Sequence, residues 1–294
     1  MNKCFITKLP SSVDNDNLPV LGQLKINWLK QDALSDNSQR GLWLSTNDSI
    51  TVKVSGAHFT DKTLTSNLGN TKTITAADGR VALYVSNDAD AILTIDNKYS
   101  LTVLETTPNF ETSKLSSISF DIDDIRYCTN LISLVLQSPQ VIGDISAVSN
   151  LTNIKVLGLV NTQVSGNIDS LASITKLTDF GGLQGTSLIG DMSKIPAGVN
   201  FISQLNRKVT TNFTWTANGR KNATLLAIDG NVPFDTASMD NMFIDQATCT
   251  FKGNDGQPWT KAISVSGTRT SASDAAVETI QNMGVTITGV TKQA

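Results

Sequence analysis

The chain has 294 residues, of which 39% are hydrophobic and 17% are charged, and its formal net charge is −3. This length suffices for one large domain or two ordinary ones, while the slightly acidic balance argues against nucleic-acid binding, which requires a basic surface. No stretch approaches the roughly eighteen apolar residues of a membrane-spanning helix, and the first residues hold no apolar run typical of a secretory signal.

The first third of the chain predicts short β-strands. Apolar and polar residues alternate in segments such as 50–54 and 81–85, and clusters of Asn, Asp, Gly and Ser separate the segments. We expect strands over residues 23–29, 49–55, 72–75, 80–86, 91–95 and 100–105. The pattern predicts an Ig-like β-sandwich over residues 1–107, although the Cys…Trp…Cys spacing of a true immunoglobulin domain is missing.

The middle of the chain contains a repeat with a period of 23 residues. A strand motif of spaced Leu, Ile or Phe residues recurs at this step, and a second marker, Gly-x-Ile or Gly-x-Met, recurs at steps of 23 and 24 residues. The strand motifs begin at Leu131, Ile154 and Leu177, and the markers begin at Gly143, Gly166 and Gly190. Such a period predicts a solenoid, in which each unit buries its apolar side against its neighbours.

The same step reappears near the C-terminus, between residues 263–265 and 286–288. Apolar residues at helical spacing predict short helices over residues 239–247 and 271–284, the second of which ends at Gly284. We therefore predict a mainly β protein with short helices, in which the sandwich is followed by one solenoid over residues 108–294.

The exposed face of the solenoid strands is the candidate partner-binding surface. Since Leu131, Leu134 and Leu136 are expected to point inward, the residues between them point outward by strand alternation. The candidate residues are Ser133, Val135, Val156, Gly158, Asp179 and Gly181. This face is small, apolar and nearly uncharged, which fits a solvated sheet and a contact between subunits equally well.

No catalytic, metal or cofactor site is predicted. His58 is the only histidine, which excludes zinc sites built from several histidines. Asp121, Asp123 and Asp124 are interpreted as a solvated capping turn rather than a calcium site or a glycosidase pair. Four tryptophans are interpreted as buried and not as a sugar-stacking platform, and three isolated cysteines as small buried hydrophobes: Trp28, Trp43, Trp215 and Trp259, with Cys4, Cys128 and Cys249.

The repeat resembles the leucine-rich-repeat family. Residues 154–177 match its L-x-x-L-x-L strand and the following x-L-x-G-x-I segment, and the resemblance covers residues 115–202. The family's asparagine after the strand is mostly missing, because Pro139, Thr162 and Gly185 stand in its place. The resemblance implies a stacked solenoid that binds other macromolecules, with an irregular asparagine ladder.

Two further segments, residues 6–22 and 263–277, resemble virion proteins of tailed phages that infect gut Bacteroidales, the crAss-like group included. This resemblance implies a non-enzymatic head-fibre, capsid-decoration or tail-fibre subunit that is made in the host cytoplasm without a signal peptide. It also implies that the domain over residues 1–107 serves for anchoring or oligomerisation. Its expected partners are a second or third copy of itself, capsid or other virion proteins through the N-terminal domain, and a host-surface glycan or protein.

Two alternatives remain open. A bacterial surface adhesin would bind glycans or host proteins through the solenoid, but it needs an export signal that the N-terminal residues do not show. A polysaccharide-degrading enzyme would need paired carboxylates, for which the sequence offers only scattered aspartates.

Overall fold

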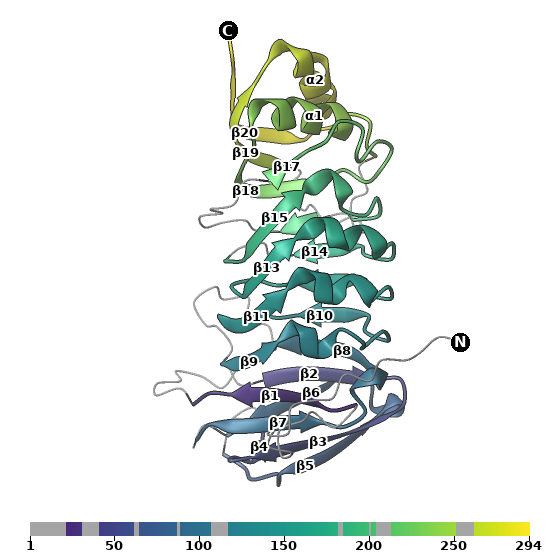
Figure 1. The fold of residues 1–294 in the computed structure, drawn as a ribbon, viewed down its shortest axis with the longest axis vertical. Coiled ribbons are helices and arrows are strands. Elements are labelled where there is room, and N and C mark those ends of the chain that lie inside the picture. Colours follow the sequence, from purple (N-terminus) through teal and green to yellow (C-terminus); the bar gives the residue numbers. More distant parts are fainter. Residues whose placement is uncertain are drawn as a thin grey trace, which may run out of the picture.

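The computed structural model describes residues 22–30, 41–61, 65–86, 89–106, 117–181, 185–199, 201–203, 213–250 and 262–294. In this part of the chain, two open β-sheets extend along an elongated molecule and enclose one hydrophobic core (Figure 1). The protein is thus mainly β with a few short helices, as expected. None of the described helices is long and apolar enough to cross a membrane.

The first sheet contains nine strands among the described residues. Their order is β17 (Phe213–Thr214), β15 (Ser187–Asp191), β13 (Gln163–Asn167), β11 (Gln140–Asp144), β9 (Ile118–Asp121), β1 (Leu24–Trp28), β7 (Ala91–Ile95), β3 (Ser49–Ser55) and β5 (Thr71–Thr75).

The second sheet contains eleven strands among the described residues. Their order is β20 (Thr286–Lys292), β19 (Ala262–Arg269), β18 (Ala227–Pro233), β16 (Phe201–Ser203), β14 (Asp179–Gly181), β12 (Val156–Gly158), β10 (Ser133–Val135), β8 (Leu101–Thr106), β2 (Gly41–Thr46), β6 (Val81–Val85) and β4 (Phe59–Thr60).

Strands β1 to β8 form the N-terminal end and pair with one another in antiparallel fashion. The six strands expected in this region are present, each within one or two residues of the predicted bounds. Strands β2 and β4 were not predicted. In β2 the half-exposed Trp43 lies between the buried Leu42 and Leu44, so the apolar–polar alternation that marks a strand is absent.

From β9 onward the strands pair with one another in parallel, and each central unit adds one strand to each sheet, whereas β18, β19 and β20 of the last units all join the eleven-stranded sheet. Residues one period apart are direct neighbours: Leu134 pairs with Leu157, which pairs with Phe180. Two of the leucines expected to face inward, Leu131 and Leu136, are fully buried, as is Leu134. The 23-residue period therefore does correspond to stacked units. We call residues 117–294 the stacked region.

A 3₁₀ helix follows the second strand of each central unit. These helices are η5 (Ile122–Ile125), η6 (Ile145–Asn150), η7 (Ile168–Ser173) and η8 (Met192–Lys194). Each is preceded by an Asp or Asn whose side chain accepts a hydrogen bond from the backbone N–H two residues later, which satisfies one of the free donors at a helix start.

The Gly-x-Ile and Gly-x-Met markers fit each unit against the preceding one. Gly143, Gly166 and Gly190 all have a positive φ, between 103° and 126°, which side chains rarely adopt. A Cβ added to Gly166 would come within 2.5 Å of the Asp144 carboxylate of the preceding unit. Glycine is thus required at this position both by the backbone angle and by the close approach of the neighbouring unit.

Both sheets continue from the N-terminal end into the stacked region. Strand β8 pairs in parallel with β10, and β1 pairs with β9. The expected domain boundary at residue 107 falls among residues 107–116, which lie outside the described residues. Hydrogen-bonded strands therefore connect the two expected domains, and the boundary at residue 107 stays a prediction.

The last units return through the two expected helices, α1 (Thr236–Gln246) and α2 (Asp274–Asn282). Asp240 of α1 is buried and accepts hydrogen bonds from Ser273 and Thr270 at the start of the next helical segment. Burial alone would raise the pKa of Asp240, but these hydrogen bonds and the charge of Arg269 hold it below its usual value. A charged side chain thus fastens α1 to the final unit.

A second buried polar cluster lies beneath the last turn of α1. The guanidinium of Arg220 is 2% exposed and donates to four backbone carbonyl groups, those of Ile195, Pro196, Val199 and Thr224. Burial lowers the pKa of Arg220 to about 10. The buried Asp245 accepts from the indole N–H of Trp215 at 2.8 Å. This cluster connects three neighbouring units. It supplies hydrogen bonds to buried backbone carbonyl groups that apolar side chains alone would leave unpaired.

Candidate functional site

The six predicted surface residues form two adjacent columns on the eleven-stranded sheet. Ser133 pairs with Val156, which pairs with Asp179, and Val135 pairs with Gly158, which pairs with Gly181. The strands that carry them, β10, β12 and β14, lie side by side in the middle of the stack (Figure 1). The structure thus brings all six residues together in the register that the period predicts. We call these six residues the strand-face columns.

Two of the six are less accessible than strand alternation suggests. Ser133 is only 8% exposed because its hydroxyl donates to the Glu105 carboxylate at 2.5 Å. Gly158 is buried, since the Val135 side chain leans over it and would meet an added Cβ at 3.2 Å. The expectation that both point freely into solvent is therefore wrong, and Val135, Val156, Asp179 and Gly181 form the accessible part.

A polar and aromatic group that the sequence did not reveal extends the columns toward the N-terminal end. Glu105 pairs with Val135 on one side and with Trp43 on the other. The Arg80 guanidinium forms an ion pair with Glu105 and lies 4.6 Å from the centre of the Trp43 ring, within the range of a cation–π contact. No local pattern indicates this group, because Trp43 lies on β2, Glu105 lies on β8 and Arg80 directly precedes β6, far apart in the sequence.

The resulting surface combines a narrow apolar strip with a charged and aromatic end. The strip offers two valines and a glycine with little side-chain bulk, next to the Asp179 carboxylate, so a flat partner can approach the backbone closely. The end around Trp43 offers an aromatic ring, a guanidinium and a carboxylate. Such a surface suits macromolecular contact, in which aromatic and Arg side chains act as anchors.

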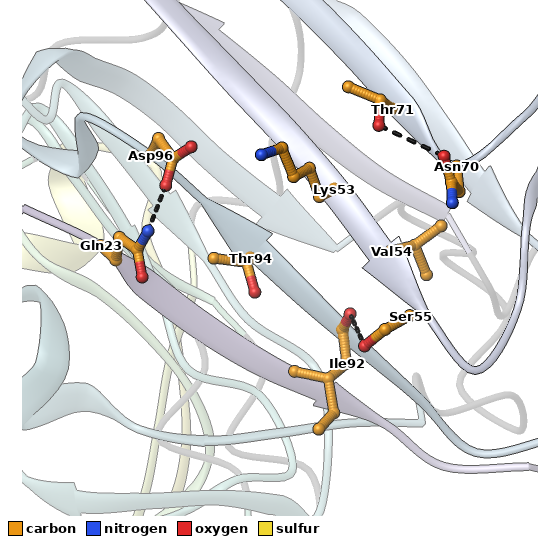
Figure 2. Close-up of a pocket in the computed structure, with 9 residues that line it drawn as sticks. All are labelled: Gln23, Lys53, Val54, Ser55, Asn70, Thr71, Ile92, Thr94 and Asp96. Atoms are coloured by element: carbon orange, nitrogen blue, oxygen red, sulfur yellow. Dashed lines mark hydrogen bonds between the residues drawn. The ribbon is translucent and has the colours of Figure 1, made fainter. Parts of the chain in front are cut away.

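A hollow of about 310 Å³ lies on the other sheet, over β1, β7, β3 and β5. Figure 2 shows Lys53 extending across the sheet toward Asp96, which accepts a hydrogen bond from Gln23 at 2.5 Å. Ser55, Thr71 and Thr94 also line it. The hollow therefore offers one ammonium group and three hydroxyls to a small polar ligand, on the face opposite the strand-face columns.

The acidic turn is a capping structure. Asp121 accepts from the backbone N–H of Asp123 at 2.9 Å, and Asp123 forms an ion pair with Arg126. Burial is the main cause that raises the pKa of Asp124, whose backbone carbonyl accepts from Lys98. Within the described residues, no three His, Cys, Asp or Glu side chains gather as metal ligands would.

The remaining candidates are dispersed. Trp28 and Trp215 are buried, Trp43 lies on the sheet surface and Trp259 lies outside the described residues. Cys128 and Cys249 are free and buried, as expected, and Cys4 lies outside the described residues. Burial raises the pKa of Cys128 to about 11. His58, half-buried, makes backbone hydrogen bonds with Ser86.

Comparison with known proteins adds no relationship: no family model matches the sequence, and no curated protein matches it significantly.

Proposed function

We propose that this protein is a non-enzymatic structural protein of a tailed-phage virion, a head-fibre or capsid-decoration subunit that displays a repeat domain for adhesion or interaction. The observation that carries the proposal is the stacking of parallel strands, which runs from β9 to β17 on the nine-stranded sheet and from β10 to β20 on the eleven-stranded sheet. A stack of this kind presents a long outer face, and long faces serve the binding of other macromolecules.

We further propose that the stacked region is a leucine-rich-repeat solenoid. The register of 23 residues, the buried leucines and the positive-φ marker glycines of three consecutive units support this assignment. For the N-terminal end we propose an Ig-like sandwich, supported by its antiparallel pairing in two packed sheets.

The virion location is supported by the resemblance of residues 6–22 and 263–277 to phage virion proteins. In this proposal the N-terminal end attaches the protein to the particle, and the stacked region extends away from it. Because hydrogen-bonded strands connect the two ends, the strand-face columns would be held at a fixed angle to the particle surface.

The location is tested by quantitative mass spectrometry on density-gradient-purified phage particles and on washed host outer membranes. We expect the protein in the particles at a fixed number of copies relative to the major capsid protein, and that number separates head decoration from tail fibre. Detection only in the membrane fraction would refute the virion proposal and favour a bacterial surface adhesin.

The binding role of the strand-face columns is tested with a pair of matched variants. Val156→Lys places a charge in the accessible strip, while Ile142→Lys places the same charge on the other sheet, where Ile142 is 46% exposed. We expect the first variant to lose attachment to host cells or partner proteins and the second to retain it. Equal attachment by both variants would show that the columns are not the contact surface.

A further inference from the structure

The ends of the two sheets differ in how they are protected against pairing with another strand. Exposed edge strands invite such pairing, and proteins protect them with short strands or with lysines. Among the described residues the four edges are β4, β5, β17 and β20. Strands β4 and β17 have two residues each, and the five-residue β5 carries Lys72 at its second position.

Strand β20 is the least protected of the four edges, although its register against β19 shifts after Thr288 and Gly289 has a φ of +79°. It has seven residues, Thr286–Lys292, without proline, and its only charged residue is Lys292 at its end. It pairs with β19 on one side, and no described strand pairs with its other side. Ile287 and Val290 remain only partly buried there. Within the described part of the chain, the C-terminal end of the eleven-stranded sheet thus presents backbone donors and acceptors that no strand pairs, together with incompletely covered apolar side chains.

We propose that β20 pairs with β20 of a second copy, antiparallel and centred on Thr288, so that the eleven-stranded sheets of two chains join into one. A two-fold axis through this position places Thr288 opposite its own copy and Lys292 opposite Gly284 of the partner copy. Threonine pairs across strands are favourable, and this closed arrangement leaves neither copy with an unprotected long edge.

The charges at this end fit the same arrangement. Asp274 begins α2 and forms ion pairs with Arg269 and Lys292, so these three side chains together carry one positive charge. The last turn of α2 has no basic residue, although the C-terminus of a helix favours a cation. Because Gly284 lies two residues after Asn282, the last residue of α2, the two-fold axis brings the positive cluster of each copy beside the C-terminus of the other copy's α2.

A hollow beside Lys292 provides room for this contact. It measures about 460 Å³ and is lined by Thr270, Ser271, Lys292, Gln293 and Ala294. In the proposed pair the turn that follows α2 of the second copy, at Gly284, lies against this hollow. The unprotected edge, the uncompensated helix end and the hollow therefore all belong to one interface, which is distinct from the strand-face columns.

The test is the molar mass of the purified chain, measured by size-exclusion chromatography with light scattering over a concentration series. We expect the wild type at twice the chain mass of 31.4 kDa. Thr288→Lys and Thr288→Asp each place like charges on the two-fold axis, and both are expected to be monomeric. Thr73→Lys, on the exposed edge strand β5 at the other end, is the matched control and is expected to remain dimeric.

An equimolar mixture of Thr288→Lys and Thr288→Asp is the decisive sample, because opposite charges then meet on the axis. We expect it to restore the dimer, as a heterodimer visible by native mass spectrometry. A wild type that stays monomeric, a dimeric Thr288→Lys variant, or a mixture that stays monomeric would overturn the proposal. Since the assay uses the isolated protein, its outcome is independent of whether the protein belongs to a virion.

Discussion

Replacing Gly166 with alanine tests whether close contact between units, rather than hydrophobic burial alone, sets the stability of the stack. The φ of Gly166 is +103°, and an added Cβ would lie 2.5 Å from the Asp144 carboxylate. Forcing a non-glycine residue into such a conformation costs about 1–3 kcal/mol, and overpacking adds about 1–3 kcal/mol. We therefore expect Gly166→Ala to lower the free energy of unfolding by about 2–6 kcal/mol, a large fraction of a typical domain's stability.

Two control variants separate the conformational cost of a positive φ from the cost of the close contact between units. Gly79 has a φ of +65° with nothing within 4 Å of an added Cβ, so Gly79→Ala carries only the conformational cost of about 1–3 kcal/mol. Gly158 has an ordinary φ, so Gly158→Ala reports only its contact with Val135. The free energies are measured by urea unfolding followed by circular dichroism. If Gly166→Ala is no more destabilising than Gly79→Ala, contact between units contributes nothing and the reasoning fails.

Three further outcomes follow from the buried polar groups. Arg220→Ala is expected to lower the free energy of unfolding by about 3–5 kcal/mol, because it removes the buried partner of several carbonyl groups. The control Arg126→Ala, on the surface, should lower it by less than about 1 kcal/mol. Comparable losses for the two variants in urea unfolding would contradict this expectation. The pKa of Asp240 is lowered in the folded protein, so its contribution is complete above the unfolded pKa of about 3.9 and is lost as the pH falls below that value. Asp240→Asn should therefore flatten the acid side of the stability profile, and an unchanged profile would exclude this role. The thiol of Cys128 is buried with a pKa of about 11, so peptide mapping after alkylation at pH 8 should find it unmodified until denaturant is added, and rapid native labelling would contradict its burial.

The stacking could be predicted because the same repeat places apolar residues in the core and glycines where the backbone needs a positive φ. Leu134, Leu157 and Phe180 recur at one step and occupy one buried row. The marker glycines could be recognised from the same step, but the reason for them could not, since the carboxylate that excludes a side chain from Gly166 belongs to the preceding unit.

The wrong or missing predictions share one physical cause: side chains from distant parts of the sequence cover residues that local patterns place in solvent. Ser133 looked exposed because alternation says nothing of Glu105, which reaches it from a strand 28 residues earlier. Likewise, β2 escaped prediction because its outward Trp43 is apolar and lies against Arg80. Strand β11 carries the apolar Ile142 on its solvent-exposed side. Its sequence therefore also lacks the alternation of apolar and polar residues that is typical of a half-buried strand.

The strands that connect the N-terminal end to the stacked region also determine how the molecule would respond to force. The strands lie across the long axis of the molecule (Figure 1), so tension between its two ends pulls along the inter-strand hydrogen bonds. Under such a load one row of bonds opens before the next, because each unit contacts only its neighbours. The chain would thus lengthen in steps of one unit, about 23 residues long in its middle part, and absorb work gradually as it is stretched.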